Sequence, residues 1–188
     1  MATLTSLATG STVRFTRRFM GALVLDPMTF EDVEADRHAG GQAALVVLLA
    51  CLAGGFATIG STPMTLPTFA MGAVTVLGAW VVWALLIATI GTHMMPEPQT
   101  NSRPGELLRT MGFAAAPGVF LAFGAIPSAA PFAFVVALLW MAAATVLAVR
   151  QALDYRSLAR AAIVSVTAWL LAFAIVASAG LLLARSVS

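Results

Sequence analysis

The sequence predicts an all-α polytopic membrane protein, a bundle of five transmembrane helices preceded by an N-terminal interfacial amphipathic segment. Of the 188 residues, 60% are hydrophobic and 10% are charged, and the mean hydropathy is +0.95. Soluble domains carry about 25% charged residues, so a soluble fold of this composition could not cover its own surface. Five apolar runs are long enough to cross the bilayer, which takes about 20 residues in a helix. The basic residues lie in alternate linkers, as the topology of such a bundle requires.

The five expected spans lie at roughly 41–60, 68–92, 107–126, 131–150 and 158–184. None has an ionisable residue near its centre. Pumps and proton-coupled carriers usually keep ionisable residues within their spans, so an ion-coupled transporter is disfavoured. A passive pore or a lipid scramblase-like groove stays open.

The distribution of arginine predicts the orientation. Arginines, the only basic residues besides two histidines, occupy the tail 1–39 and the linkers 93–106 and 150–160, whereas the linkers 61–67 and 127–131 have none. Because basic residues concentrate on the cytoplasmic side, five spans with a cytoplasmic N-terminus and an external C-terminus are expected. The absence of lysine and the abundance of alanine and glycine suggest a GC-rich coding sequence and favour a bacterial inner (cytoplasmic) membrane.

The tail 1–39 is expected to be separate from the transmembrane domain 40–188 and to contain an amphipathic helix. In "TVRFTRRFMGALVL" a helix places Arg14, Arg17 and Arg18 on one side and Phe15 and Phe19 on the other. Such a stretch is suited to lying in the headgroup layer.

A second, acidic helix is expected next in the tail. Asp26 is the expected N-cap and Pro27 the first helical residue. Phe30 falls on an apolar face, whereas Glu31 and Glu34 belong to an acidic remainder. One interpretation is a solvated surface helix whose charges only keep it out of lipid. The other is a docking surface for a partner or for the basic cytoplasmic loops.

The third expected span contains Pro117 with no turn residues around it. Proline removes a backbone donor and clashes with the carbonyl four residues earlier, which a neighbouring helix can relieve inside a membrane bundle. Ala114 and Gly118 form a small-xxx-small pair, which lets another backbone approach closely. We therefore expect an internal bend packed against another span, either purely structural or a hinge that forms a site.

A polar cluster is expected at one depth near the cytoplasmic ends of the third, fourth and fifth spans. Its members are Arg109, Arg150, Asp154, Arg156 and Arg160. One interpretation is flanking charges that snorkel and fix the topology. The other is a basic pocket for an anionic lipid headgroup, or a dock for the acidic helix.

No residue pattern indicates catalysis, a cofactor or a metal. His93 and Glu97 are four residues apart, but Pro96 interrupts the helix between them, and two ligands do not make a metal site. Cys51 is the single cysteine, so an internal disulfide is excluded. A net charge of +2 is too small to indicate nucleic acid. We therefore expect a non-enzymatic protein without cofactor or metal.

Three stretches occur in a characteristic order: "LDPMTFEDV" before the first span, "LLRTMGFAAAPGVF" opening the third, and "VLAVRQALDYRSLARAAIVSVTAWLL" joining the fourth and fifth. Together with the five-span pattern they resemble the YIP-domain family, the Ypt-interacting proteins, over roughly residues 20–184. The resemblance implies five spans and a cytosolic N-terminus, and prokaryotic-type members mostly lack an assigned role. Eukaryotic members bind Rab-type GTPases through a longer tail with an Asp-Leu-Tyr-Gly-Pro-type segment. This chain has "VLDPM" instead, so Rab-type binding is not expected.

The function that we expect is that of a membrane-organising adaptor or scaffold, with membrane lipids and other membrane proteins or a second copy as partners. The alternatives are a small transporter, channel or lipid-handling protein, or an accessory subunit of a membrane complex. If the protein is an adaptor, deleting the acidic helix should abolish partner capture but not membrane insertion. If it is a transporter or a channel, a substitution at Pro117 should alter the flux in reconstituted vesicles.

Overall fold

The computed structural model describes residues 2–60, 65–98, 100 and 103–187. This part of the chain is helical and contains no strand. The α-helices are α1 (Ala2–Leu23), α2 (Pro27–Ala35), α3 (Gly40–Ala57), α4 (Leu66–Thr89), α5 (Pro104–Ala114), α6 (Ala130–Ala152) and α7 (Leu158–Val187). Shorter helices are η1 (Arg37–Ala39), η2 (Thr58–Gly60), the π-helix η3 (Ile90–Met94) and the 3₁₀-helix η4 (Ala116–Ala125).

Five helical stretches are long and apolar enough to cross a membrane, as expected. They are Arg37–Gly60, Leu66–Met94, Pro104–Ala125, Ala130–Ala152 and Leu158–Leu182. Their bounds differ by only a few residues from the expected spans. The chain is therefore an integral membrane protein.

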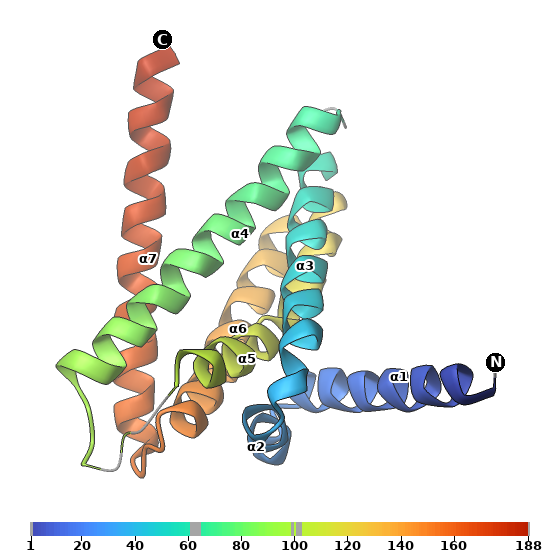
Figure 1. Cartoon of the computed structure of the whole chain (residues 1–188). Helices are drawn as coiled ribbons and strands as arrows, with labels where there is room; N and C mark the ends of the chain where they lie inside the picture. Colours follow the sequence, from blue (N-terminus) through green and yellow to red (C-terminus); the bar gives the residue numbers. More distant parts are fainter. Residues whose placement is uncertain (1, 61–64, 99, 101–102, 188) are drawn as a thin grey trace.

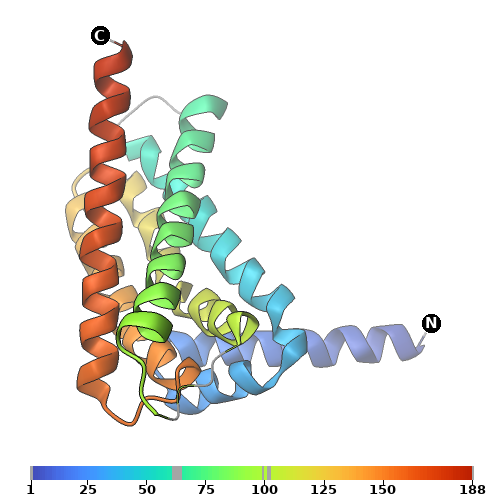
Figure 2. The same ribbon diagram turned by 60° about the vertical axis from the view of Figure 1, so that its left-hand side comes forward.

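The tail helices lie at one end of this bundle. Helix α1 runs crosswise to α3, and its N-terminus projects away from the spans (Figures 1 and 2). Helix α2 and the turn between α6 and α7 lie at the same end, whereas the C-terminus lies at the other (Figure 1). We call the end that carries α1, α2 and the α6–α7 turn the polar end.

Helix α2 begins as the sequence predicts and packs against the spans. The Asp26 carboxylate accepts the Met28 amide at 3.1 Å and the Thr29 hydroxyl at 2.9 Å, and Pro27 opens the helix. Phe30 and Val33 are fully buried in a cluster with residues of α1, α3, α5 and α6. The tail is thus packed onto the transmembrane bundle.

Pro117 changes the type of helix in the third span. Helix α5 ends at Ala114, and the chain continues as η4 with Pro117 in its first turn. The Ala115 amide donates to the Gly112 carbonyl at 3.3 Å, and the Gly118 amide donates to the Ala115 carbonyl at 2.8 Å. A continuous α-helix would need a backbone donor at Pro117 and space for the proline ring. Pro117 lies in the first turn of a 3₁₀-helix, where its missing donor is not needed. The expected bend is therefore a change from α to 3₁₀ winding.

The 3₁₀ winding brings small residues of the third span against α3. Two turns take six residues in a 3₁₀-helix and about seven in an α-helix. Two glycines of η4, six residues apart, accordingly meet two alanines of α3, seven residues apart, and Gly112 at the end of α5 meets a third alanine of α3. A Cβ atom added to each glycine would lie within 3.0 Å of the facing alanine Cβ, in the pairs Gly112–Ala43, Gly118–Ala50 and Gly124–Ala57. The absence of a side chain at these glycines permits the close contact of the two spans.

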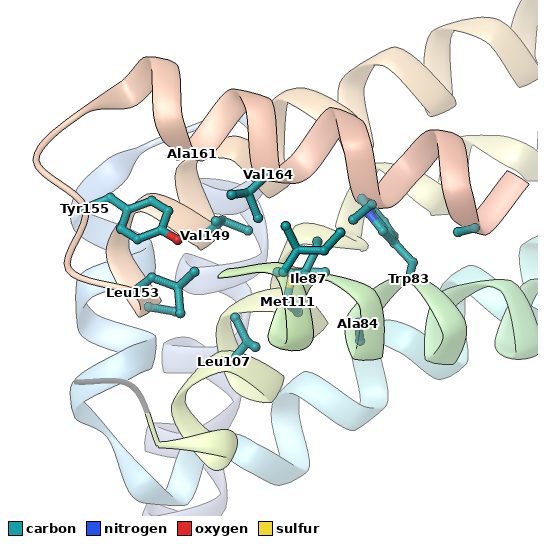
Figure 3. Packing of buried hydrophobic residues seen from close by; sticks show 14 residues of the cluster. Trp83, Ala84, Ile87, Leu107, Met111, Val149, Leu153, Tyr155, Ala161 and Val164 are labelled. Carbon is teal, nitrogen blue, oxygen red and sulfur yellow. The ribbon is translucent and has the colours of Figure 1, made fainter. Parts of the chain in front are cut away.

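A buried apolar cluster joins α4 to α5, α6 and α7 (Figure 3). Ile87 of α4, Met111 of α5 and Val149 of α6 are almost fully buried in it. Trp83 meets Trp169 of α7 edge to face, with ring centroids 6.3 Å apart. Trp83 and Trp169 thus serve the packing of α4 against α7.

Candidate functional site at the polar end

Arg18 of α1 is the central cation of the polar end. Its side chain is 4% exposed. It donates to Asp32 of α2 at 2.9 Å, to Asp36 at 2.9 Å and to Gln42 of α3 at 3.0 Å. Arg17 beside it is exposed and reaches Asp32 at 2.8 Å. The arginine face of α1 therefore packs against protein at Arg18, whereas Arg14 and Arg17 are exposed.

These ion pairs favour the charged carboxylates. The hydrogen bond from Arg18 is the largest cause that lowers the pKa of Asp32. The pKa of Asp36 is also lowered, first by the backbone amide of His38, which donates to it at 2.9 Å, and then by Arg18. Both carboxylates therefore remain ionised at neutral pH and hold α1 against α2.

Arg109 of α5 binds the C-terminal end of α2. Its Nη2 donates to the Glu34 carbonyl at 2.6 Å, and its Nε donates to the Val33 carbonyl at 3.3 Å. The last carbonyls of a helix lack partners within the helix and carry partial negative charge, so a guanidinium is a favourable cap. Arg109 thus holds the acidic helix through its backbone and leaves the carboxylates free for other contacts.

Glu34 turns its side chain towards α6. Burial is the largest cause that raises the pKa of this carboxyl, and a hydrogen bond with the Gln151 side chain partly opposes the rise. Helix α6 ends nearby with Asp154 in the left-handed region, at φ 53°. Asp tolerates this conformation better than most residues. The Tyr155 amide then donates back to the Arg150 carbonyl at 2.9 Å and closes the turn.

Arg156 and Arg160 lie on the other side of this turn, against the linker that follows η3. The Arg156 amide donates to Glu97 at 3.1 Å, and the Arg160 guanidinium is 3.4 Å from the same carboxylate. Arg160 also donates to the Pro96 carbonyl at 3.1 Å. Of the expected cluster, Arg109 therefore contacts the acidic helix, whereas Arg156 and Arg160 contact the linker that follows η3.

The structure thus divides the expected cluster. Arg109 lies under α2, Arg156 and Arg160 lie at Glu97, and Arg150 and Asp154 are exposed at the end of α6. Pro117, Ala114 and Gly118 are buried in the third span, between α3 and α6. The residues of the tail helix that remain exposed include Pro27 and Glu31, whereas Asp26 and Glu34 are half-buried.

Sequence reasoning missed three polar contacts that connect distant segments. Arg18 is buried, Tyr155 places its hydroxyl 2.8 Å from the carbonyl oxygens of Gly91 and Met95, and Trp140 donates to the Leu23 carbonyl at 2.8 Å. For Arg18 a signal existed: the carboxylates of Asp32 and Asp36 are four residues apart on one helix face. Tyr155 and Trp140 bond to backbone carbonyls, which no residue pattern marks.

The arrangement is suited to binding. Among the described residues, no group of three or more His, Cys, Asp or Glu side chains could hold a metal ion. The polar end instead presents ion pairs, one exposed helix face and exposed arginines, which can recognise charged partners or lipid headgroups.

The comparisons with known proteins agree with this architecture. Searches of curated proteins and of solved structures gave no match to the chain. The family model of the Yip1 domain matches residues 21–179. This match begins near the end of α1, contains α2, the first four spans and most of the fifth, and covers most of the chain. The chain therefore belongs to the Yip1 domain family of membrane proteins.

Proposed function

We propose that this protein is a non-enzymatic membrane adaptor whose polar end faces the cytoplasm and binds a partner protein. The proposed location is a bacterial inner membrane, and the proposed orientation has the C-terminus outside. The positive-inside rule supports this orientation, since the tail and the linkers 93–106 and 150–160 carry nearly all of the arginines.

The observation that carries the proposal is the way α2 is held. Arg18 of α1 binds its carboxylates, Arg109 of α5 binds its last carbonyls, and Gln151 of α6 binds Glu34. A helix held from three elements is preorganised, so a partner that binds it loses little affinity to ordering.

One face of this fixed helix stays available. Met28, Glu31 and Ala35 are exposed, and their spacing of three and four residues places them on one side of α2. Met28 is 68% exposed, and an exposed methionine beside a carboxylate offers an adaptable apolar contact and a charge. We propose this face, together with Arg150 and Asp154, as the partner surface.

Site-directed photocrosslinking tests the proposal. The full chain in native membranes would carry a photocrosslinking residue at Met28 or, as a control, at Leu139 of α6, which is 66% exposed on a span. We expect one defined protein to be captured from position 28 and lost when Glu31→Arg is added. Equal capture from both positions, or capture that ignores Glu31→Arg, would refute the adaptor.

The orientation is tested separately by labelling. A Cys51→Ala background removes the one cysteine, and cysteines are then placed at Glu31 and at Arg185, which are exposed and lie outside the spans. In intact cells, a membrane-impermeant maleimide should label position 185 and leave position 31 unlabelled until the cells are opened. The reverse pattern would invert the proposed topology.

A further inference from the structure

An apolar groove lies between α3, α4 and α5. Helices α3 and α4 lie close together far from the polar end and separate towards it, and α5 occupies the gap (Figure 1). The groove has a volume of about 640 Å³. Its lining runs from Gly40, Gly105 and Arg109 at the polar end to Leu52 and Ala73. Among the described residues that line the groove, Arg109 is the one that is charged.

The length of the groove corresponds to one leaflet. Gly40 and Leu52 are twelve residues apart on α3, which is about 18 Å of helix. Half of the hydrocarbon layer is about 15 Å thick. The groove therefore extends from the surface of the leaflet at the polar end to about the middle of the bilayer, the depth that one lipid chain occupies.

The charge at its mouth is not neutralised by an ion pair within the described residues. Arg109 uses Nε and Nη2 on the carbonyls of Val33 and Glu34. Its Nη1 has no acceptor there and lies beside Gly105, where an added Cβ would be 3.4 Å away. The nearest acidic residue on α5 is Glu106, whose carboxylate accepts the Arg103 amide at 2.9 Å. One guanidinium nitrogen therefore stays available to an anion.

Two further arginines reinforce this charge. Arg37 precedes the lining residue Gly40 by three residues, and Arg103 precedes Gly105 by two. Both side chains are exposed. An anion at the mouth of the groove would therefore meet Arg109 directly, with Arg37 and Arg103 on the adjoining segments.

We propose that this groove binds one anionic phospholipid, with an acyl chain between α3, α4 and α5 and the phosphate at Arg109. A phospholipid has an anionic phosphate above an apolar acyl chain, and the groove has Arg109 at its mouth above an apolar lining. A second copy of the protein fits less well, because it inserts in the same orientation and would bring its own basic end against Arg109. The proposal does not depend on the protein-adaptor function.

Native mass spectrometry of the full chain tests this site. The protein, purified in mild detergent, is mixed with phosphatidylglycerol or with phosphatidylcholine at equal concentrations. We expect one bound phosphatidylglycerol, and a preference over phosphatidylcholine that falls about fivefold in Arg109→Gln. The matched control Arg156→Gln removes the same charge from an exposed arginine of the polar end and should leave the preference unchanged.

A second variant tests the binding of the acyl chain separately from the binding of the headgroup. Ala44 is exposed and lines the groove, so Ala44→Phe fills the groove and leaves Arg109 intact. We expect it to lower the binding of both lipids, with helicity and unfolding temperature preserved. Equal binding of the two lipids by the native protein, an equal loss in Arg156→Gln, or unchanged binding in Ala44→Phe would overturn the proposal.

Discussion

The close contact between the third span and α3 gives a quantitative prediction for Gly118→Ala. The added Cβ would lie 2.8 Å from the Cβ of Ala50 and 3.3 Å from the Met141 sulfur. Carbon atoms in contact sit about 3.5–4.0 Å apart, so the spans would have to separate locally by about 0.7–1.2 Å. Overpacking of this kind typically costs about 1–3 kcal/mol.

The measurement is the unfolding free energy of the purified chain in detergent, followed by tryptophan fluorescence and circular dichroism. Gly78→Ala is the matched control, because nothing lies within 4 Å of a Cβ at that helical glycine. It should be neutral or stabilising, since alanine favours a helix over glycine by about 1 kcal/mol. Gly118→Ala should be destabilising by comparison.

A double variant tests the cause. Ala50→Gly removes the facing Cβ, so Gly118→Ala should cost less in that background, with a coupling of about 0.5–3 kcal/mol. Two results would refute the reasoning: Gly118→Ala behaving like Gly78→Ala, or a cost that Ala50→Gly leaves unchanged. Either would mean that the spans do not meet at this pair.

Three further predictions concern the polar contacts. Tyr155→Phe removes the hydroxyl that lies 2.8 Å from the carbonyl oxygens of Gly91 and Met95. It should lower the unfolding free energy by about 1–2 kcal/mol in the same assay. An unchanged unfolding free energy would show that these carbonyls find other donors. Arg18→Ala leaves the carboxylates at 32 and 36 without their shared cation, so it should cost about 1–3 kcal/mol and expose α1 to protease. Arg37→Ala, at an exposed position of η1, should do neither. Because the pKa values of these two carboxyls are lowered on folding, their contribution is present above the ordinary pKa of about 4 and is lost as the pH falls through the lower folded values. Proteolysis of α1 should therefore be constant from pH 7 to about pH 5 and rise only below about pH 4, and a rise near neutral pH would contradict this assignment.

The sequence predicted the five spans and the start of α2 because both depend on local chemistry. Long apolar runs need no knowledge of their neighbours, and Asp26 caps the residues that directly follow it. The polar cluster was less predictable. Arg109, Arg156 and Arg160 share a depth and a charge, yet one of them binds carbonyls of α2 while the other two meet Glu97. Depth and charge are sequence properties, whereas the choice of partner depends on which helix lies alongside.

The third span shows the same division most clearly. The sequence by itself required a break at Pro117, since proline cannot donate a backbone hydrogen bond. It did not decide whether the chain would kink or change its winding, because both satisfy proline locally. The tertiary structure shows a change of winding that fits α3: Gly118 and Gly124, six residues apart in the 3₁₀-helix, meet Ala50 and Ala57, seven residues apart in the α-helix. Composition and local backbone chemistry thus determined a five-span membrane bundle, whereas packing between spans decided the winding of the third span and the groove beside it.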